Sequence, residues 1–402
     1  MTGKSRVVPR ANSRRLVDRI GLTGTGLAAL TPTDIRAWFD RIRAGQLDAA
    51  EYKATLLLVY RTWLIAFFLK ALGSGWDVAW HFRYNRDDFA PPHVINLVGD
   101  GIAIVLVLCH WYTRFGVDKI AFRLMAGGVT LFVASAPIDV INHKINGLDI
   151  TSWSITHFGL YTGTAIMISG VIRGWRLHSE GLYSEGLSGR SVILGTLWLF
   201  FLENVWFPNQ HQEYGVEEIL SWDRGQPYAE KSLLDFAAVQ LGLPAGAPVP
   251  RDAVVQFSLP VQPWVYPLWA VAAAMLTLVI ARRSVGLRWT ATTIAVGYVG
   301  WRCVLWPILA GVSFPTSAVP FLILAGALAI DLICLLDLPW PAEAALGATV
   351  ATLAVYLAGF VQSYALVAPP ISYWSAPIAA LILFAGWSAL AGLRARRNLT
   401  LF

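Results

Sequence analysis

The sequence predicts an all-α integral membrane protein, a polytopic bundle of about ten transmembrane helices with a duplicated helical hairpin. Of the 402 residues, 56% are hydrophobic and only 14% are charged, whereas a soluble domain carries about 25% charged residues. Mean hydropathy is +0.55, and several nearly uncharged stretches reach the length of about 20 residues that crosses a bilayer as a helix. These features exclude a soluble enzyme, a disordered chain, a nucleic-acid-binding module and an outer-membrane barrel.

Residues 1–53 form a polar, arginine-rich segment that is predicted to lie in the cytoplasm. Within it, Thr31 as the N-cap residue and Pro32 at the first helical position mark the start of a short helix. Its apolar residues recur on one face, opposite the charged residues: Ile35, Trp38, Phe39 and Ile42. Such an amphipathic helix is predicted to lie on the membrane surface, and a soluble packing helix is the alternative.

Ten membrane spans follow, and the charges between them predict an orientation. The spans are expected near residues 55–74, 92–113, 120–138, 153–174, 190–207, 262–281, 289–310, 317–336, 346–364 and 375–394. Arginine and lysine cluster on one side of this arrangement, so both termini are expected in the cytoplasm. The other side holds the acidic or mixed loops 75–91, 139–152 and 208–261. The basic residues that give the net charge of +6 are therefore interpreted as setting the orientation in the membrane, and no nucleic-acid partner is expected.

Aspartate and histidine recur at the outer ends of two predicted hairpins. The first hairpin carries Asp77-x-x-x-His81 at the end of one span and His93 at the start of the next. The second hairpin repeats the element at matching positions with Asp139, His143 and His157. Charged residues at membrane depth are costly and usually functional, so this duplicated element is the main candidate site.

The chemistry of these residues favours a metal ion. Asp and His four residues apart lie one above the other on a helix, with Cβ atoms about 6 Å apart, so both side chains reach one ion. A second His from the partner helix completes a two-histidine, one-carboxylate set with open positions for O₂, water or substrate. Such a set suits copper, iron or zinc, in two separate sites or one binuclear centre. Hairpin caps that hydrogen-bond loop amides without any metal are the alternative.

The motif and the spans together divide the chain into four parts. After the N-terminal segment, residues 54–207 are predicted to form a metal-binding membrane bundle of two repeated hairpins and a fifth span. Residues 208–261 are predicted to form an extracytoplasmic loop, and residues 262–402 a C-terminal membrane bundle. The three cysteines lie in apolar runs and are interpreted as packing residues, not as a disulfide or a thiolate site: Cys109, Cys303 and Cys334.

The first motif also resembles a known family. The run Asp77-x-x-x-His81, then residues 86–89 (Arg-Asp-Asp-Phe), then Pro91-x-His93 is similar to the metal-site segment of the C subunit of copper membrane monooxygenases. These enzymes are the particulate methane and ammonia monooxygenases. The resemblance implies that copper is the cofactor and that Asp77, His81 and His93 form one ligand set.

The second motif matches the same family with one substitution. The family's second set is an Asn-x-x-x-His followed by a further His, and this chain has Asp in place of Asn: Asp139, His143 and His157. The first loop is one residue shorter than the family pattern. The resemblance covers about residues 72–165, spans six to ten have no counterpart, and the soluble copper-binding domain of the family's B subunit is absent.

Other polar residues near the motifs are weaker candidates. His211 is either an extra ligand or a solvated loop residue. Asp100 shares a helix face with His93 and either accepts a hydrogen bond from a ligand histidine or pairs with a neighbour. His110 is interpreted as structural.

Two of the remaining spans also carry intramembrane charges. Arg302 needs a partner, for which Glu203 is preferred over Asp331. Glu203 lies near the outer end of the fifth span and is expected to close one wall of a cavity. The two hairpins are expected to pack side by side, so that His81 and His143 face this cavity and residues 208–261 lie above it.

These observations predict an integral membrane metalloprotein that oxidises a small apolar substrate with O₂, at a metal site near the extracytoplasmic side. A non-copper metalloenzyme, such as a zinc hydrolase on the same ligands, is one alternative. A transporter or metal-handling protein is another. The bilayer is an expected partner, and additional membrane subunits or a homo-oligomer are candidate partners.

Overall fold

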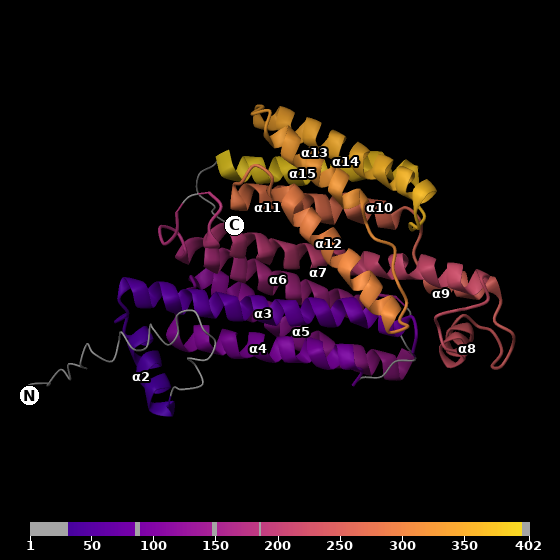
Figure 1. The fold of residues 1–402 in the computed structure, drawn as a ribbon, viewed down its shortest axis with the longest axis horizontal. Coiled ribbons are helices and arrows are strands. Elements are labelled where there is room, and N and C mark those ends of the chain that lie inside the picture. Colours follow the sequence, from indigo (N-terminus) through magenta and orange to yellow (C-terminus); the bar gives the residue numbers. More distant parts are fainter. Residues whose placement is uncertain (1–30, 85–88, 147–150, 185, 396–402) are drawn as a thin grey trace, which may run out of the picture.

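The computed structural model describes residues 31–84, 89–146, 151–184 and 186–395, and Figure 1 shows its long helices packed side by side. Within these ranges the chain is helical and contains no β-strand, which confirms the predicted all-α bundle. Nine of the described helices are long and apolar enough to cross a membrane. The protein is therefore a multi-pass membrane protein in contact with the lipid bilayer.

These nine helices lie close to the predicted spans. They are α3 (Ala49–His81), α4 (Pro91–Thr113), α5 (Lys119–Asn146), α6 (Ile155–His178), α7 (Gly189–Asp223), the continuous run of α10 (Val265–Trp269), η2 (Ala270–Met275) and α11 (Leu276–Val285), α12 (Thr290–Gly311), α14 (Trp340–Ala365), and η3 (Tyr373–Ser375) with α15 (Ala376–Ala395).

The eighth predicted span, residues 317–336, is shorter than expected. Its helix, α13 (Leu322–Cys334), has 13 residues, which is about 20 Å at 1.5 Å per residue and less than the thickness of the hydrocarbon core. Two prolines, Pro315 and Pro320, lie in the irregular segment before it. Because proline lacks the backbone N–H and clashes with the preceding turn, the helix begins only after the second of them.

The predicted amphipathic helix is present as α2 (Pro32–Arg43), at the end of the bundle where α3 begins (Figure 1). The Thr31 side chain accepts a hydrogen bond from the Asp34 N–H, and the Asp34 carboxylate accepts one from the Thr31 N–H, which is a capping box. The Arg43 guanidinium lies 5.0 Å from the centre of the Tyr112 ring and so attaches α2 to the end of α4. Its place on the membrane surface stays a prediction.

The two hairpins form because glycine lets their helices approach closely. In the α3–α4 pair, a Cβ at Gly73 would lie 2.8 Å from the carbonyl oxygen of Pro92. In the α5–α6 pair, a Cβ at Gly128 would clash with the backbone nitrogen of Met167. Small residues serve this purpose between membrane helices, where close packing replaces the hydrophobic effect. The start of α4 therefore lies beside the end of α3, and the start of α6 beside the end of α5.

Helix α7 is longer than the predicted fifth span and includes the first part of the predicted loop 208–261. It runs through Pro208 to Asp223. Proline interrupts the helical hydrogen bonds, but the Trp269 indole donates to the carbonyl of Val205, at 2.6 Å, in the turn before the proline. A neighbouring helix thus donates a hydrogen bond to the backbone near the interruption, and the helix continues past the proline.

The rest of this segment holds two short helices, α8 (Lys231–Gln240) and α9 (Arg251–Ser258). Figure 1 shows both at the end of the bundle where α3 ends and α4 begins. Residues from both helices reach the cavity described below. The segment is therefore a folded cover over this end of the bundle and not an irregular loop.

The predicted orientation can be tested with cysteines at Gln226, just after α7, and at Arg288, in the basic turn between α11 and α12. Positively charged turns stay in the cytoplasm, so the two sites should lie on opposite sides. In intact cells, and in a background without the native cysteines, an impermeant maleimide should label position 226 directly and position 288 only after permeabilisation. The reverse pattern would contradict the orientation.

Candidate metal centre

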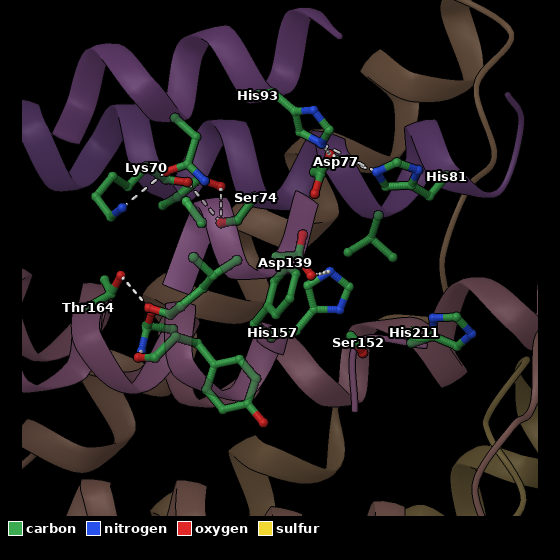
Figure 2. A pocket seen from close by; sticks show the side chains of 18 of the residues that line it. Lys70, Ser74, Asp77, His81, His93, Asp139, Ser152, His157, Thr164 and His211 are labelled. Carbon is green, nitrogen blue, oxygen red and sulfur yellow. Dashed lines mark hydrogen bonds and ion pairs between the residues drawn. The ribbon is translucent and has the colours of Figure 1, made fainter. Parts of the chain in front are cut away.

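The end of α3 and the start of α4 bring three predicted ligands together. Asp77 and His81 lie one turn apart near the end of α3, and Pro91 begins α4, so that His93 falls in its first turn. Proline suits this position because the first N–H groups of a helix have no partner within it. Figure 2 shows the side chains of Asp77, His81 and His93 pointing toward one another.

The donor atoms of these three side chains converge. His93 Nε2 lies 2.8 Å from Asp77 Oδ1, His81 Nε2 lies 3.3 Å from the same oxygen, and the two Nε2 atoms are 3.4 Å apart. Ligands bound at about 2.0–2.2 Å from one ion lie roughly 3–4 Å from each other. Two of the three separations fall in this range, and the third, from His93 to Asp77, is at hydrogen-bond distance, so the three donors converge closely enough to reach one ion after a small outward shift.

The three side chains are also accessible. The exposed fraction is 36% for the His81 side chain, 22% for Asp77 and 21% for His93. The histidine side chains are therefore open to an incoming ion, whereas the Asp77 Oδ1 atom is itself buried. The exposure of the histidines leaves room for further ligands such as water or O₂.

The second hairpin brings two of its three predicted ligands together. His157 Nε2 lies 3.7 Å from Asp139 Oδ1, and the same carboxylate oxygen accepts a hydrogen bond from the Thr156 hydroxyl at 2.6 Å. His157 Nδ1 donates to the carbonyl oxygen of Thr151 at 3.0 Å, which leaves Nε2 as the nitrogen able to bind a metal. The side chain of His143 lies outside the described part of the structure.

The described members of the two sets line one cavity of about 300 Å³, on opposite sides of it (Figure 2). The α3–α4 hairpin supplies Asp77, His81 and His93, and the α5–α6 hairpin supplies Asp139 and His157. The side-by-side packing predicted from the repeat thus agrees with the structure for the described side chains. The lining of the cavity is mostly apolar, and it includes aromatic residues from α3, α5 and α7: Phe67, Phe132, Phe200 and Phe207.

An ion pair that the sequence analysis missed lies deeper in the cavity. Lys70 Nζ is 2.6 Å from Asp100 Oδ1 and 3.1 Å from Asn96 Oδ1, and both charged residues are buried. Asp100 therefore pairs with a neighbour and does not accept a hydrogen bond from His93. The sequence contained a signal for this ion pair. Lys70 lies seven residues before Asp77, and Asp100 lies seven residues after His93, so both lie two helical turns from the metal-site residue on their own helix.

Two other histidines do not join the ligand sets. His211 is buried on α7, where its Nε2 donates to the carbonyl oxygen of Phe257 at 3.3 Å, so it is not a solvated loop residue, although it lines the cavity. His110 accepts a hydrogen bond from the Trp63 indole at 3.0 Å and donates to the carbonyl oxygen of Phe115 at 2.9 Å. Both of its ring nitrogens are used within the protein, as its structural interpretation predicts.

The prediction that Arg302 pairs with Glu203 is wrong. Its guanidinium lies 2.8 Å from Glu213 and not beside Glu203 in an ion pair. Because α7 continues past Pro208, the helix carries Glu213 into the bundle, at a position that the sequence analysis assigned to a loop. Asp331 pairs with Arg282 instead, at 3.1 Å.

The donor set fits a transition metal by its chemistry. Two imidazole nitrogens and one carboxylate oxygen meet at Asp77, His81 and His93, which suits copper, iron or zinc. Within the described part of the chain, these three residues form a converging group of metal-binding side chains, because their ligand atoms all lie within 4.8 Å of one another. Comparisons with protein-family models, with curated proteins and with solved structures give no match for this chain.

Proposed function

We propose that the protein is a membrane metalloenzyme related to the copper membrane monooxygenases, which oxidises a small apolar substrate with O₂. The observation that carries this proposal is the convergence of Asp77, His81 and His93 at the rim of a largely apolar cavity. Copper is the proposed metal, and iron and zinc are the alternatives on the same ligands.

The residues of the first hairpin would hold the metal. Asp77 supplies one oxygen, and His81 and His93 supply one nitrogen each, so that coordination positions remain on the exposed side. When bound there, the metal supplies the capacity to bind and reduce O₂. Asp139, His143 and His157 are proposed as the second ligand set, across the same cavity.

The apolar part of the cavity would hold the substrate. The rings of Phe67, Phe132, Phe200 and Phe207 exclude water and favour a small hydrocarbon-like molecule over a charged one. A volume of about 300 Å³ lies at the lower end of the usual range for small-molecule sites. The two hairpins thus position an apolar molecule beside the metal ligands, as oxidation of a substrate requires.

The proposal predicts that the purified, full-length protein carries at least one transition-metal ion per chain. Elemental analysis after gel filtration identifies the metal, and electron paramagnetic resonance of a copper-loaded sample should show coupling to nitrogen from imidazole ligands. Protein that neither retains nor takes up copper, iron or zinc would contradict the proposal. Metal binding without reductant-dependent O₂ consumption in the presence of short-chain hydrocarbons would favour a metal-handling protein instead.

A further inference from the structure

Glu203 is a buried carboxyl group in the wall of the cavity. It lies on α7, is 3% exposed and lines the same cavity as the metal ligands. A Cβ built at Gly75 of α3 would lie 3.8 Å from Glu203 Oε1, and Gly75 is two residues before Asp77. The carboxyl group therefore packs against α3 just below the candidate metal centre.

Neutral groups, not cations, satisfy this carboxyl group. Gln210 donates to Glu203 Oε1 at 2.9 Å, and Tyr298 of α12 lies beside it. The nearest cation is Arg302 of α12, whose guanidinium pairs with Glu213 at 2.8 Å. Within the described ranges Glu203 takes part in no ion pair and accepts no backbone N–H.

The other buried carboxyl groups of this region differ in their partners. Asp100 has Lys70 at 2.6 Å, Glu213 has Arg302, and Glu218 accepts hydrogen bonds from the backbone N–H groups of Tyr228 and Ala229. These partners offset part of the cost of burying each carboxylate in its charged form, whereas Glu203 has neither a cation nor a backbone N–H as a partner among the described residues.

The charges around Glu203 therefore do not balance without a proton. The cluster of Glu203, Glu213 and Arg302 contains two carboxyl groups and one guanidinium. An uncompensated carboxylate in an apolar interior is strongly disfavoured, so such a group binds a proton instead. Glu203 is the member of the cluster without an ion pair and is the group on which this proton belongs.

We propose that Glu203 is a neutral carboxylic acid in the wall of the cavity, able to give its proton to a basic atom of a molecule bound there. On donation the carboxylic O–H bond breaks and a bond from hydrogen to the acceptor forms. The resulting carboxylate keeps the hydrogen bond from Gln210 and lies in the field of Arg302. The identity of the acceptor rests on the proposed function, whereas the protonation of Glu203 does not.

Infrared spectroscopy of the full-length protein at neutral pH tests this protonation directly. The wild type should show carbonyl stretches from protonated carboxylic acids, which move in protein labelled with ¹³C-glutamate, and one component of this band should disappear in Glu203→Gln. The matched control is Glu218→Gln, another buried glutamate on α7, and it should leave that component in place. Absence of the band from the wild type, or the same band in Glu203→Gln as in the wild type, would overturn the proposal.

A second variant keeps the proposal testable if Glu203→Gln does not fold. Gln210→Leu removes the hydrogen bond to Oε1 and should shift the band to higher frequency, because a free carbonyl is stiffer than a hydrogen-bonded one. A band that does not move in Gln210→Leu would contradict the assignment to Glu203. Metal content is measured on the same samples, so failure of the metal proposal is visible separately from failure of this one.

Discussion

Replacement of His93 by alanine is expected to remove the metal bound by the α3–α4 hairpin while the bundle stays folded. The variant keeps only two of the three converging donor residues, Asp77 and His81. Loss of a residue that merely orients a ligand lowers metal affinity by about 10–100-fold, so loss of a ligand should cost at least as much. Equilibrium dialysis followed by elemental analysis measures the change.

His178→Ala is the matched control for this experiment. His178 also lies at a helix end, where its ring bonds to the Tyr52 hydroxyl at 3.1 Å, but it does not line the cavity. This variant should keep its metal. If folded His93→Ala keeps it as well, Asp77 and the two histidines are hairpin caps and not ligands. His157→Ala, alone and combined with His93→Ala, then reports how many ions the two hairpins hold.

Replacement of Arg302 by methionine is expected to destabilise the protein strongly. Arg302 is 3% exposed, and its guanidinium lies 2.8 Å from Glu213, which is 0% exposed. Removing one partner leaves a buried charge without compensation, which costs about 3–5 kcal/mol. The free energy of unfolding in mixed micelles with a denaturing detergent should fall by this amount.

Two further variants separate the buried charge from loss of packing. Arg302→Met combined with Glu213→Gln removes both charges, and the glutamine still accepts hydrogen bonds from Trp206 and Tyr266 as Glu213 does. This double variant should recover most of the lost stability. Lys231→Met breaks an ion pair on the surface, with the lysine side chain 82% exposed, and should change stability by less than about 1 kcal/mol. Equal effects of Arg302→Met and Lys231→Met would contradict the interpretation.

Much of the first hairpin could be predicted from local sequence. Asp77 and His81 are four residues apart, which places both on one helix face, and Pro91 marks the start of the helix that carries His93. Hydrophobic length predicted ten spans, because a helix must satisfy its own backbone in lipid, and nine of them are long apolar helices among the described residues. The exception, α13, is short because of prolines that the hydropathy pattern does not register.

Other parts of the site could not be predicted because they depend on contacts between distant segments. Helix α7 continues through Pro208, next to a turn whose Val205 carbonyl accepts a hydrogen bond from Trp269, more than 60 residues later in the chain. This extension buries His211 and brings Glu213 to Arg302, which leaves Glu203 without a cation. A proline in a single sequence looks like a helix end, and only the neighbouring helix shows otherwise.

The sequence by itself determined the membrane class, the repeated hairpins and the residues that share a helix face, because these follow from periodicity and from the cost of exposing backbone to lipid. The tertiary structure decided which faces meet. It set the α3–α4 register that pairs Asp77 with His93 and, two turns deeper, Lys70 with Asp100. It also turned both hairpins toward one cavity. The physical reason is that ion pairs and close glycine contacts join residues from separate helices, whose relative positions no local pattern specifies.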